Sequence, residues 1–175
     1  MHVVTDPQLD EATEKNFAAM MTKAGNIINQ LKKTSSDVIE LMRQLKTPVS
    51  EYGRGVIEDQ LKHEFRVALK GNVPAGLMTP FASLFAQCAV DDVQFDVAKH
   101  GRSIVIYFLC TTVKAMNNLH KMIKSRFMDT VFAEVINLLT PTPTTVRVFV
   151  RDEDFNLAPS VLSSAQGLLF VRFLN

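Results

Sequence analysis

A heptad spacing near the start of the chain constrains the fold more than any other feature. From residue 17 to residue 49, ten positions follow one another at alternating intervals of four and three residues, and nine of them are apolar. This spacing is typical of the a/d seam of a coiled coil or of one face of a helical hairpin. The heptad positions are Phe17, Met21, Ala24, Ile28, Leu31, Ser35, Val38, Met42, Leu45 and Val49.

The stretch KKTSSDVIE, residues 32–40, leaves two arrangements open. Lys32 and Lys33 suit the last turn of one helix, and Asp37 followed by Glu40 suits the start of another. A break here would let the two halves fold back on each other, whereas a single helix preserves the heptad phase. We favour a single helix, because a hairpin through only the three residues TSS would be tight.

The chain after the heptad segment continues in a helical pattern. Pro48 ends the heptad element, and Ser50 is a suitable cap for a second helix that extends to Gly71. The residues EFRVAL, 64–69, also fit a strand, and this alternative stays open. Next, Thr79-Pro80 favours the start of a short and almost wholly apolar helix, with Thr as the cap and Pro at the first helical position.

The hydrophobic period then changes from helical to two, which is the period of strands. Residues 92–110 read as an antiparallel hairpin with its turn at Gly101, and residues 111–140 read as one long helix. A third strand is expected at 144–150 and a fourth at 167–174, the apolar stretch GLLFVRFL. A chain that stops on an apolar strand fits either a fragment of a longer polypeptide or a terminal strand at the centre of a sheet.

This order of elements predicts an α+β fold, a two-layer sandwich in which helices pack on one face of a three- to four-stranded antiparallel sheet. Residues 1–49 would form a heptad-bearing helical segment, and residues 50–175 an α/β sandwich domain. With 47% hydrophobic and 21% charged residues, the chain has the ordinary composition of a globular protein and enough apolar side chains for a sizeable core.

A family resemblance rests on the order strand, turn, apolar strand, long helix and strand between residues 91 and 151. The residues that carry it are Gly101, the strand 103–109, Leu119, Lys124-Ser125, Phe127 and Phe132. This segment resembles the N-terminal α/β-sandwich domain of the tumour-necrosis-factor-receptor-associated death-domain adaptor and similar invertebrate domains. The resemblance implies a scaffold or adaptor that works through protein–protein contacts without catalysis. No binding motif matches position by position, so the resemblance assigns no partner-binding residue.

The charge balance argues against a protein dedicated to nucleic acid or to anionic membranes. Nineteen basic and eighteen acidic residues give a net charge of +1, whereas such binders usually carry a basic excess on one element. One local exception is a basic stripe formed by Lys114, Lys121, Lys124 and Arg126. Its lysines share a face of the expected helix, where they could meet an acidic partner, an anionic lipid or a phosphate backbone. A nucleic-acid-binding module that uses residues 112–126 is therefore the alternative function.

The sequence favours a protein that is not an enzyme and binds no cofactor or metal. The four histidines are scattered, and neither a histidine pair at the i, i+4 spacing nor a closely spaced cysteine pair occurs. Cys110 and His120 are the one conceivable Cys/His pair, but Cys110 ends an apolar run and no orienting Asp or Asn is evident. Gly53 and Gly55 give only a fragment of a phosphate-binding loop.

A reducing, cytoplasmic location is expected. Cys88 and Cys110 both lie in apolar surroundings, which favours buried free thiols over a disulfide scaffold. The N-terminus lacks the pattern of a signal peptide, and no apolar run approaches the roughly 20 residues of a membrane span.

Together these features predict a non-catalytic interaction or scaffold module. Its N-terminal helix would self-associate as a coiled coil, giving a homodimer or higher oligomer, or would bind a partner helix. Burial of apolar side chains would drive the association. The residues expected to carry the contact are Phe17, Met21, Ile28, Leu31, Val38, Met42 and Leu45.

Overall fold

The computed structural model describes residues 2–100 and 104–149 and shows an α+β fold, which confirms the predicted class. The elements are, in chain order, β1 (His2–Asp6), α1 (Glu11–Thr34), α2 (Ser36–Leu45), α3 (Glu51–Leu69), α4 (Ala75–Val90), β2 (Val93–His100), β3 (Ile104–Cys110), α5 (Val113–Lys124), α6 (Phe127–Leu139) and β4 (Thr145–Phe149).

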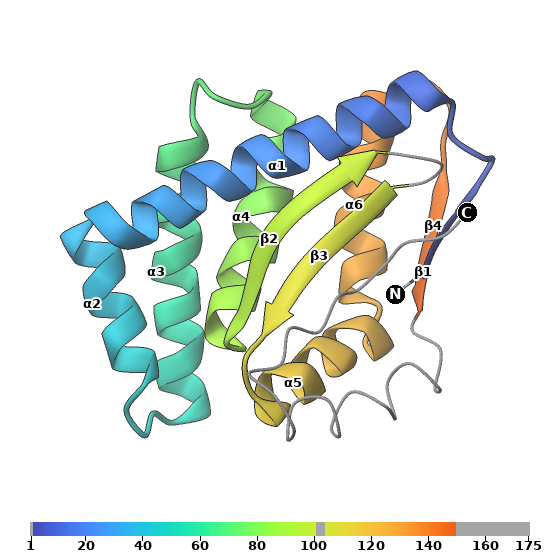
Figure 1. Ribbon diagram of the computed structural model, residues 1–175. Coiled ribbons are helices and arrows are strands. Elements are labelled where there is room, and N and C mark those ends of the chain that lie inside the picture. Colours follow the sequence, from blue (N-terminus) through green and yellow to red (C-terminus); the bar gives the residue numbers. More distant parts are fainter. Residues whose placement is uncertain (1, 101–103, 150–175) are drawn as a thin grey trace.

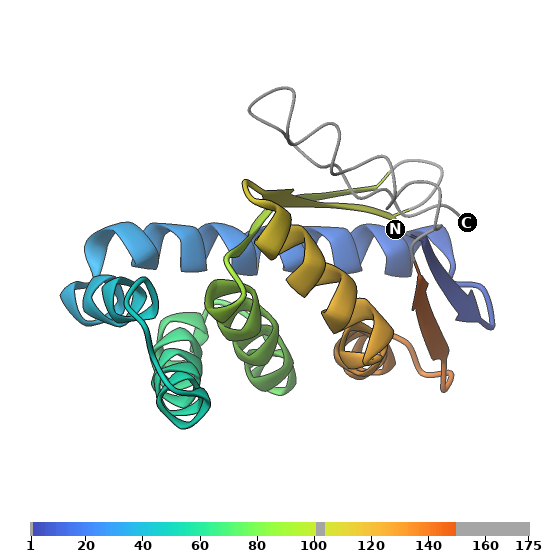
Figure 2. The same ribbon diagram turned by 90° about the horizontal axis from the view of Figure 1, so that it is seen from below.

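The long helix α1 crosses the whole molecule and organises the other elements around it (Figure 1). Helices α2, α3, α4 and α6 lie on one side of α1, and the β2–β3 hairpin lies on the other (Figure 2). Strands β1 and β4 pair beside the N-terminal end of α1 (Figure 1). Residues far apart in the sequence therefore meet along α1.

The described strands form two separate antiparallel ladders rather than one three- to four-stranded sheet. The hairpin predicted over 92–110 is present as β2 and β3, with an irregularity in the register between Phe95 and Val97. The third predicted strand is present as β4, but it pairs with β1, a strand that the sequence did not suggest. The fourth predicted strand, 167–174, lies outside the described residues.

The prediction of a single helix through the heptad segment is wrong, because the helix is interrupted at Ser35. This residue leaves the helical region of backbone space, with φ −84° and ψ 119°, so α1 and α2 meet at an angle. Its own amide donates to the Leu31 carbonyl oxygen at 2.9 Å, and its hydroxyl accepts from the Val38 amide at 3.3 Å. Ser35 thus ends one helix and caps the next, which removes the need for a longer connection.

The single helix predicted over 111–140 is also divided in two, here at Arg126. This residue has φ 61°, the left-handed conformation that commonly ends a helix, and it separates α5 from α6. Thr112 caps α5, with its hydroxyl accepting from the Ala115 amide at 3.0 Å. The turn at Arg126 brings the two amphipathic helices against each other, so both apolar faces reach the core.

The two helices in the middle of the chain agree with the sequence in kind but not in every boundary. Residues 64–69 are helical, so the strand alternative is wrong. The next helix begins at Ala75, four residues before the predicted cap Thr79, and Pro80 lies inside it. The earlier start places Leu77, which is only 1% exposed, in the core.

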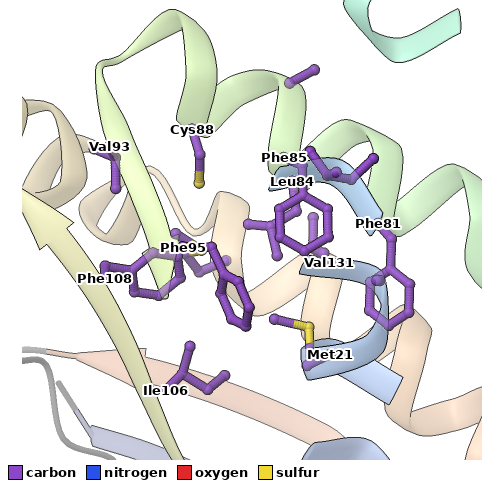
Figure 3. Packing of buried hydrophobic residues seen from close by; sticks show 14 of the residues in the cluster. Met21, Phe81, Leu84, Phe85, Cys88, Val93, Phe95, Ile106, Phe108 and Val131 are labelled. Atoms are coloured by element: carbon purple, nitrogen blue, oxygen red, sulfur yellow. The ribbon is translucent and has the colours of Figure 1, made fainter. Parts of the chain in front are cut away.

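One hydrophobic core connects these elements, and it includes residues from both 1–49 and 50–175. Within it, Phe81 and Phe85 of α4, Phe95 of β2 and Phe108 of β3 form a succession in which each ring neighbours the next (Figure 3). The Phe95 ring contacts Phe85 at 5.4 Å and Phe108 at 6.1 Å between ring centroids, both edge to face. Such pairs add to the free energy gained by burial.

Side chains of α1 form hydrogen bonds with backbone groups of β2. The Thr22 hydroxyl donates to the Ala98 carbonyl oxygen at 2.8 Å and lies 3.1 Å from the Ala98 amide nitrogen, from which it accepts. The Asn29 side-chain amide donates to the Phe95 carbonyl oxygen at 3.2 Å. Helix α1 thus hydrogen-bonds to backbone groups of an edge strand. Without these bonds, the same groups would be available to pair with another chain.

Candidate functional site

The structure places the heptad positions in the protein's own core. Phe17, Met21, Ile28 and Val38 are buried, each no more than 2% exposed. The remaining interaction candidates, Leu31, Met42 and Leu45, are partly buried and pack against the same core. In this fold the buried heptad side chains are not accessible to a second molecule, because they contact α3, α4, α6 and the hairpin.

A surface hollow between α2 and α3 is the accessible feature of the same N-terminal region. It has a volume of about 530 Å³, and every residue in its lining is uncharged. Tyr52, at its edge, has 83% of its surface exposed, and Val56 has 41%. The lining consists of Gln44, Thr47, Val49, Tyr52, Gly53, Val56, Ile57 and Gln60.

The three lysines of the predicted basic stripe lie on α5, and Arg126 lies in the turn that follows this helix. Lys114, Lys121, Lys124 and Arg126 are all exposed, but only Lys124 and Arg126 line a common cavity. This basic cavity has a volume of about 370 Å³ and is lined by His120, Ile123, Lys124, Arg126, Asp129, Arg147, Val148 and Phe149.

Arg147 is the member of the basic cavity that sequence reasoning missed. It lies on β4, where the alternation of buried and exposed residues identifies its side chain as exposed. Its position beside α5 and α6 depends on how β4 packs against these helices, and nothing local in the sequence indicates that packing. Asp129 of α6 helps to fix it, because its carboxylate accepts a hydrogen bond of 2.8 Å from the Val148 amide.

The environment of the two cysteines is unfavourable for nucleophilic catalysis. Both are free thiols and both are fully buried. Burial raises the pKa of Cys88 to about 12 and that of Cys110 to about 12. An activated cysteine needs a lowered pKa, so the pairing of Cys110 with His120 considered from the sequence lacks the electrostatics of such a site.

The structure also contains a pair of titratable residues, a histidine and a glutamate, that the sequence did not predict. His100, at the end of β2, lies 3.3 Å from the carboxylate of Glu14 in α1, measured from Nε2 to Oε2. Glu14 is buried, at 7% exposure, although charged residues are rarely buried without partners. The pair joins the first turn of α1 to the hairpin.

Among residues 2–100 and 104–149, no group of three or more His, Cys, Asp or Glu side chains is arranged to hold a metal ion.

No protein-family model, no curated protein and no solved structure matches the chain. Within the described residues, none of the helices has the length and hydrophobicity needed to cross a bilayer.

Proposed function

We propose that the protein is a non-catalytic interaction module that forms a homodimer through the hollow between α2 and α3. The observation that carries the proposal is the uncharged lining of this hollow, with the exposed ring of Tyr52 at its edge. The resemblance of residues 91–151 to an adaptor domain supports a scaffold role. The two free thiols support a reducing, cytoplasmic location.

The chemistry of the hollow suits the centre of a protein interface. Interface cores are depleted in charged residues and enriched in tyrosine, which offers a large contact area with few rotatable bonds. In a twofold-symmetric dimer the same surface meets itself, so charged residues near the axis would face their own copies. A surface without charges avoids this repulsion, which is why a second copy of the chain is the proposed occupant.

This proposal keeps the N-terminal segment as the site of association but changes the residues that carry it. Gln44, Thr47 and Val49 belong to that segment, and Tyr52 and Val56 follow at the start of α3. The contact is a surface between helices rather than a coiled-coil seam, because the heptad positions already contribute to the core.

The test is the mass of the protein by sedimentation equilibrium over a range of concentrations. We expect a monomer–dimer equilibrium for the wild type and a monomer for the double variant Tyr52→Glu, Val56→Glu. Val67→Glu is the matched control, because Val67 lies on the same helix, is 58% exposed and is outside the hollow. It should dimerise like the wild type.

Three results would contradict the proposal. One is a wild-type protein that remains a monomer at every concentration. Another is a dimer that the double variant leaves intact while its circular dichroism spectrum is unchanged. The third, a dimer broken equally by Val67→Glu, would place the contact on a different face of α3.

A further inference from the structure

The basic cavity collects cations from parts of the chain that are distant in sequence. Lys124 is the last residue of α5, Arg126 lies in the turn before α6, and Arg147 comes from β4. Across the described part of the chain, no carboxylate forms an ion pair with any of these three side chains. The carboxylate of Asp129 also lines the cavity, but its Oδ1 accepts from the Val148 amide and so holds β4 in place.

The start of α6 adds to this positive potential. Arg126 is the residue before the first turn of α6, and no side chain caps that turn. The first amides of a helix carry its positive dipole end and lack partners within the helix. The 13-residue helix thus begins beside three cations, and the carboxylate of Asp129 in its first turn offsets part of this positive potential.

The backbone conformation of Arg126 determines which substitution can remove its side chain without strain. Its φ of 61° is in the left-handed region, where a side chain costs roughly 1 kcal/mol and glycine costs little. The chain has an arginine here, whose long cationic side chain lines the cavity. Because this conformation is common at helix ends, glycine can replace Arg126 without strain, which gives a variant that removes the cation and keeps the backbone.

We propose that the basic cavity binds the phosphomonoester group of a phosphorylated serine or threonine on a partner protein. A phosphomonoester carries close to two negative charges near neutral pH and offers three acceptor oxygens, which suits converging Arg and Lys side chains. A cavity of about 370 Å³ holds the group together with part of its side chain.

A phosphopeptide fits this arrangement better than nucleic acid does. A nucleic acid presents phosphates in a row and requires cations along an extended surface. Here three cations line one cavity, and Lys114 and Lys121 of α5 lie outside the lining. The proposal is independent of dimerisation, because the hollow between α2 and α3 contributes no residue to the cavity.

The test is an NMR titration of the full chain with a short end-blocked peptide, Gly-phosphoserine-Gly, and with its unphosphorylated twin. The full chain is used because Asp152, Glu153 and Asp154 follow β4 closely in the sequence and belong in the measurement. We expect saturable shifts of the amides of residues 123–129 and 147–149 with the phosphopeptide alone. The affinity should weaken by up to about tenfold between pH 7.5 and pH 5, as the phosphate loses its second charge at a pKa of about 6.

Two variants make the test specific to the cavity. Arg147→Gln and Arg126→Gly should each weaken phosphopeptide binding about tenfold or more. Arg126→Gly should leave the melting temperature unchanged or raise it, since glycine adopts the left-handed conformation without strain. Lys114→Gln, on the same basic stripe but outside the cavity, is the matched control and should bind like the wild type.

Three outcomes would overturn the proposal. The first is the same response to both peptides, or none to either. The second is inorganic phosphate binding as tightly as the phosphopeptide, which would assign the site to free phosphate. The third is tighter binding of a DNA duplex, with a steep salt dependence and a loss of affinity in Lys114→Gln, which would assign the basic stripe to nucleic acid. The dimerisation variant Tyr52→Glu, Val56→Glu should bind the phosphopeptide normally, so the two proposals fail separately.

Discussion

Gly25 of α1 lies directly against the ring of Phe95 in β2. A Cβ atom built on Gly25 would be 2.1 Å from Cε1 and 2.2 Å from Cδ1 of that ring, far inside van der Waals contact. The ring cannot easily rotate away, because Phe85 and Phe108 pack against it edge to face. The close approach of α1 to the hairpin therefore depends on the absence of a side chain at residue 25.

The first prediction is that Gly25→Ala destabilises the protein by about 1–3 kcal/mol, the usual cost of overpacking a core. The helix gains some intrinsic stability from alanine, but the clash with Phe95 outweighs it. Urea unfolding followed by circular dichroism measures the change. Gly55→Ala is the matched control: Gly55 lies in α3 with nothing within 4 Å of its built Cβ, so alanine should stabilise the fold by about 0.5–1 kcal/mol. Equal effects of the two substitutions would contradict the close packing of α1 on β2.

The second prediction concerns the hydroxyl that occupies the edge of β2. Thr22→Val keeps the shape of the side chain but leaves the amide and carbonyl of Ala98 without their α1 partner. Unsatisfied polar groups at a partly buried position cost about 1–3 kcal/mol, and the same unfolding measurement gives this value. Thr34→Val is the control, because that hydroxyl is exposed and bonds only to the Gln30 carbonyl of its own helix. A change below about 0.5 kcal/mol at both positions would show that the edge contact contributes little.

Much of the fold could be predicted because its signals are local. The period-two alternation identified the hairpin, and the apolar periodicity identified the helices. The two errors in helix length have one physical origin, since the heptad phase continues through Ser35 and the apolar stripe continues through Arg126. Periodicity reports which residues face the core, whereas a kink depends on the backbone of a single residue.

The candidate sites were less predictable, because each depends on contacts between distant elements. The heptad pattern correctly marked a buried face but could not say whether the chain itself or a second molecule buries it. Lys124 and Arg126 were visible in the basic stripe, whereas Arg147 joins them only through the packing of β4. The pair of Glu14 and His100 likewise depends on α1 meeting the end of β2.

The third prediction is that Met21→Asp prevents folding rather than simply preventing association. Met21 is 0% exposed, so the substitution places a carboxylate in the core, where an unpaired charge is very unfavourable. We expect loss of cooperative thermal unfolding and of chemical-shift dispersion. Ala19→Asp, at an exposed position of the same helix, should remain folded. If Met21→Asp instead gives a folded monomer, the heptad positions form an interface between molecules, as the sequence pattern suggested.

The last prediction is a loss of stability at high pH that depends on Cys88. Burial raises the pKa of its thiol to about 12, above the value near 9 of an exposed cysteine. The folded state therefore holds this proton more tightly than the unfolded state does. The protonated thiol of Cys88 therefore contributes fully to the free energy of unfolding below pH 9. This contribution is lost as the pH rises from 9 towards 12.

Urea unfolding at pH 8 and at pH 10.5 measures this contribution. The wild type should lose about 2 kcal/mol more than Cys88→Ala between the two pH values, at 1.36 kcal/mol for each unit of the pKa difference that is crossed. Groups that do not interact with Cys88 cancel in the comparison, whereas Lys32 interacts electrostatically with this thiol and contributes to the difference. A thiol reagent at pH 8 supplies an independent measurement, because buried thiols should react only after denaturant is added. Rapid labelling of Cys88 in the native protein, or parallel pH dependence in the two proteins, would contradict the buried, protonated state.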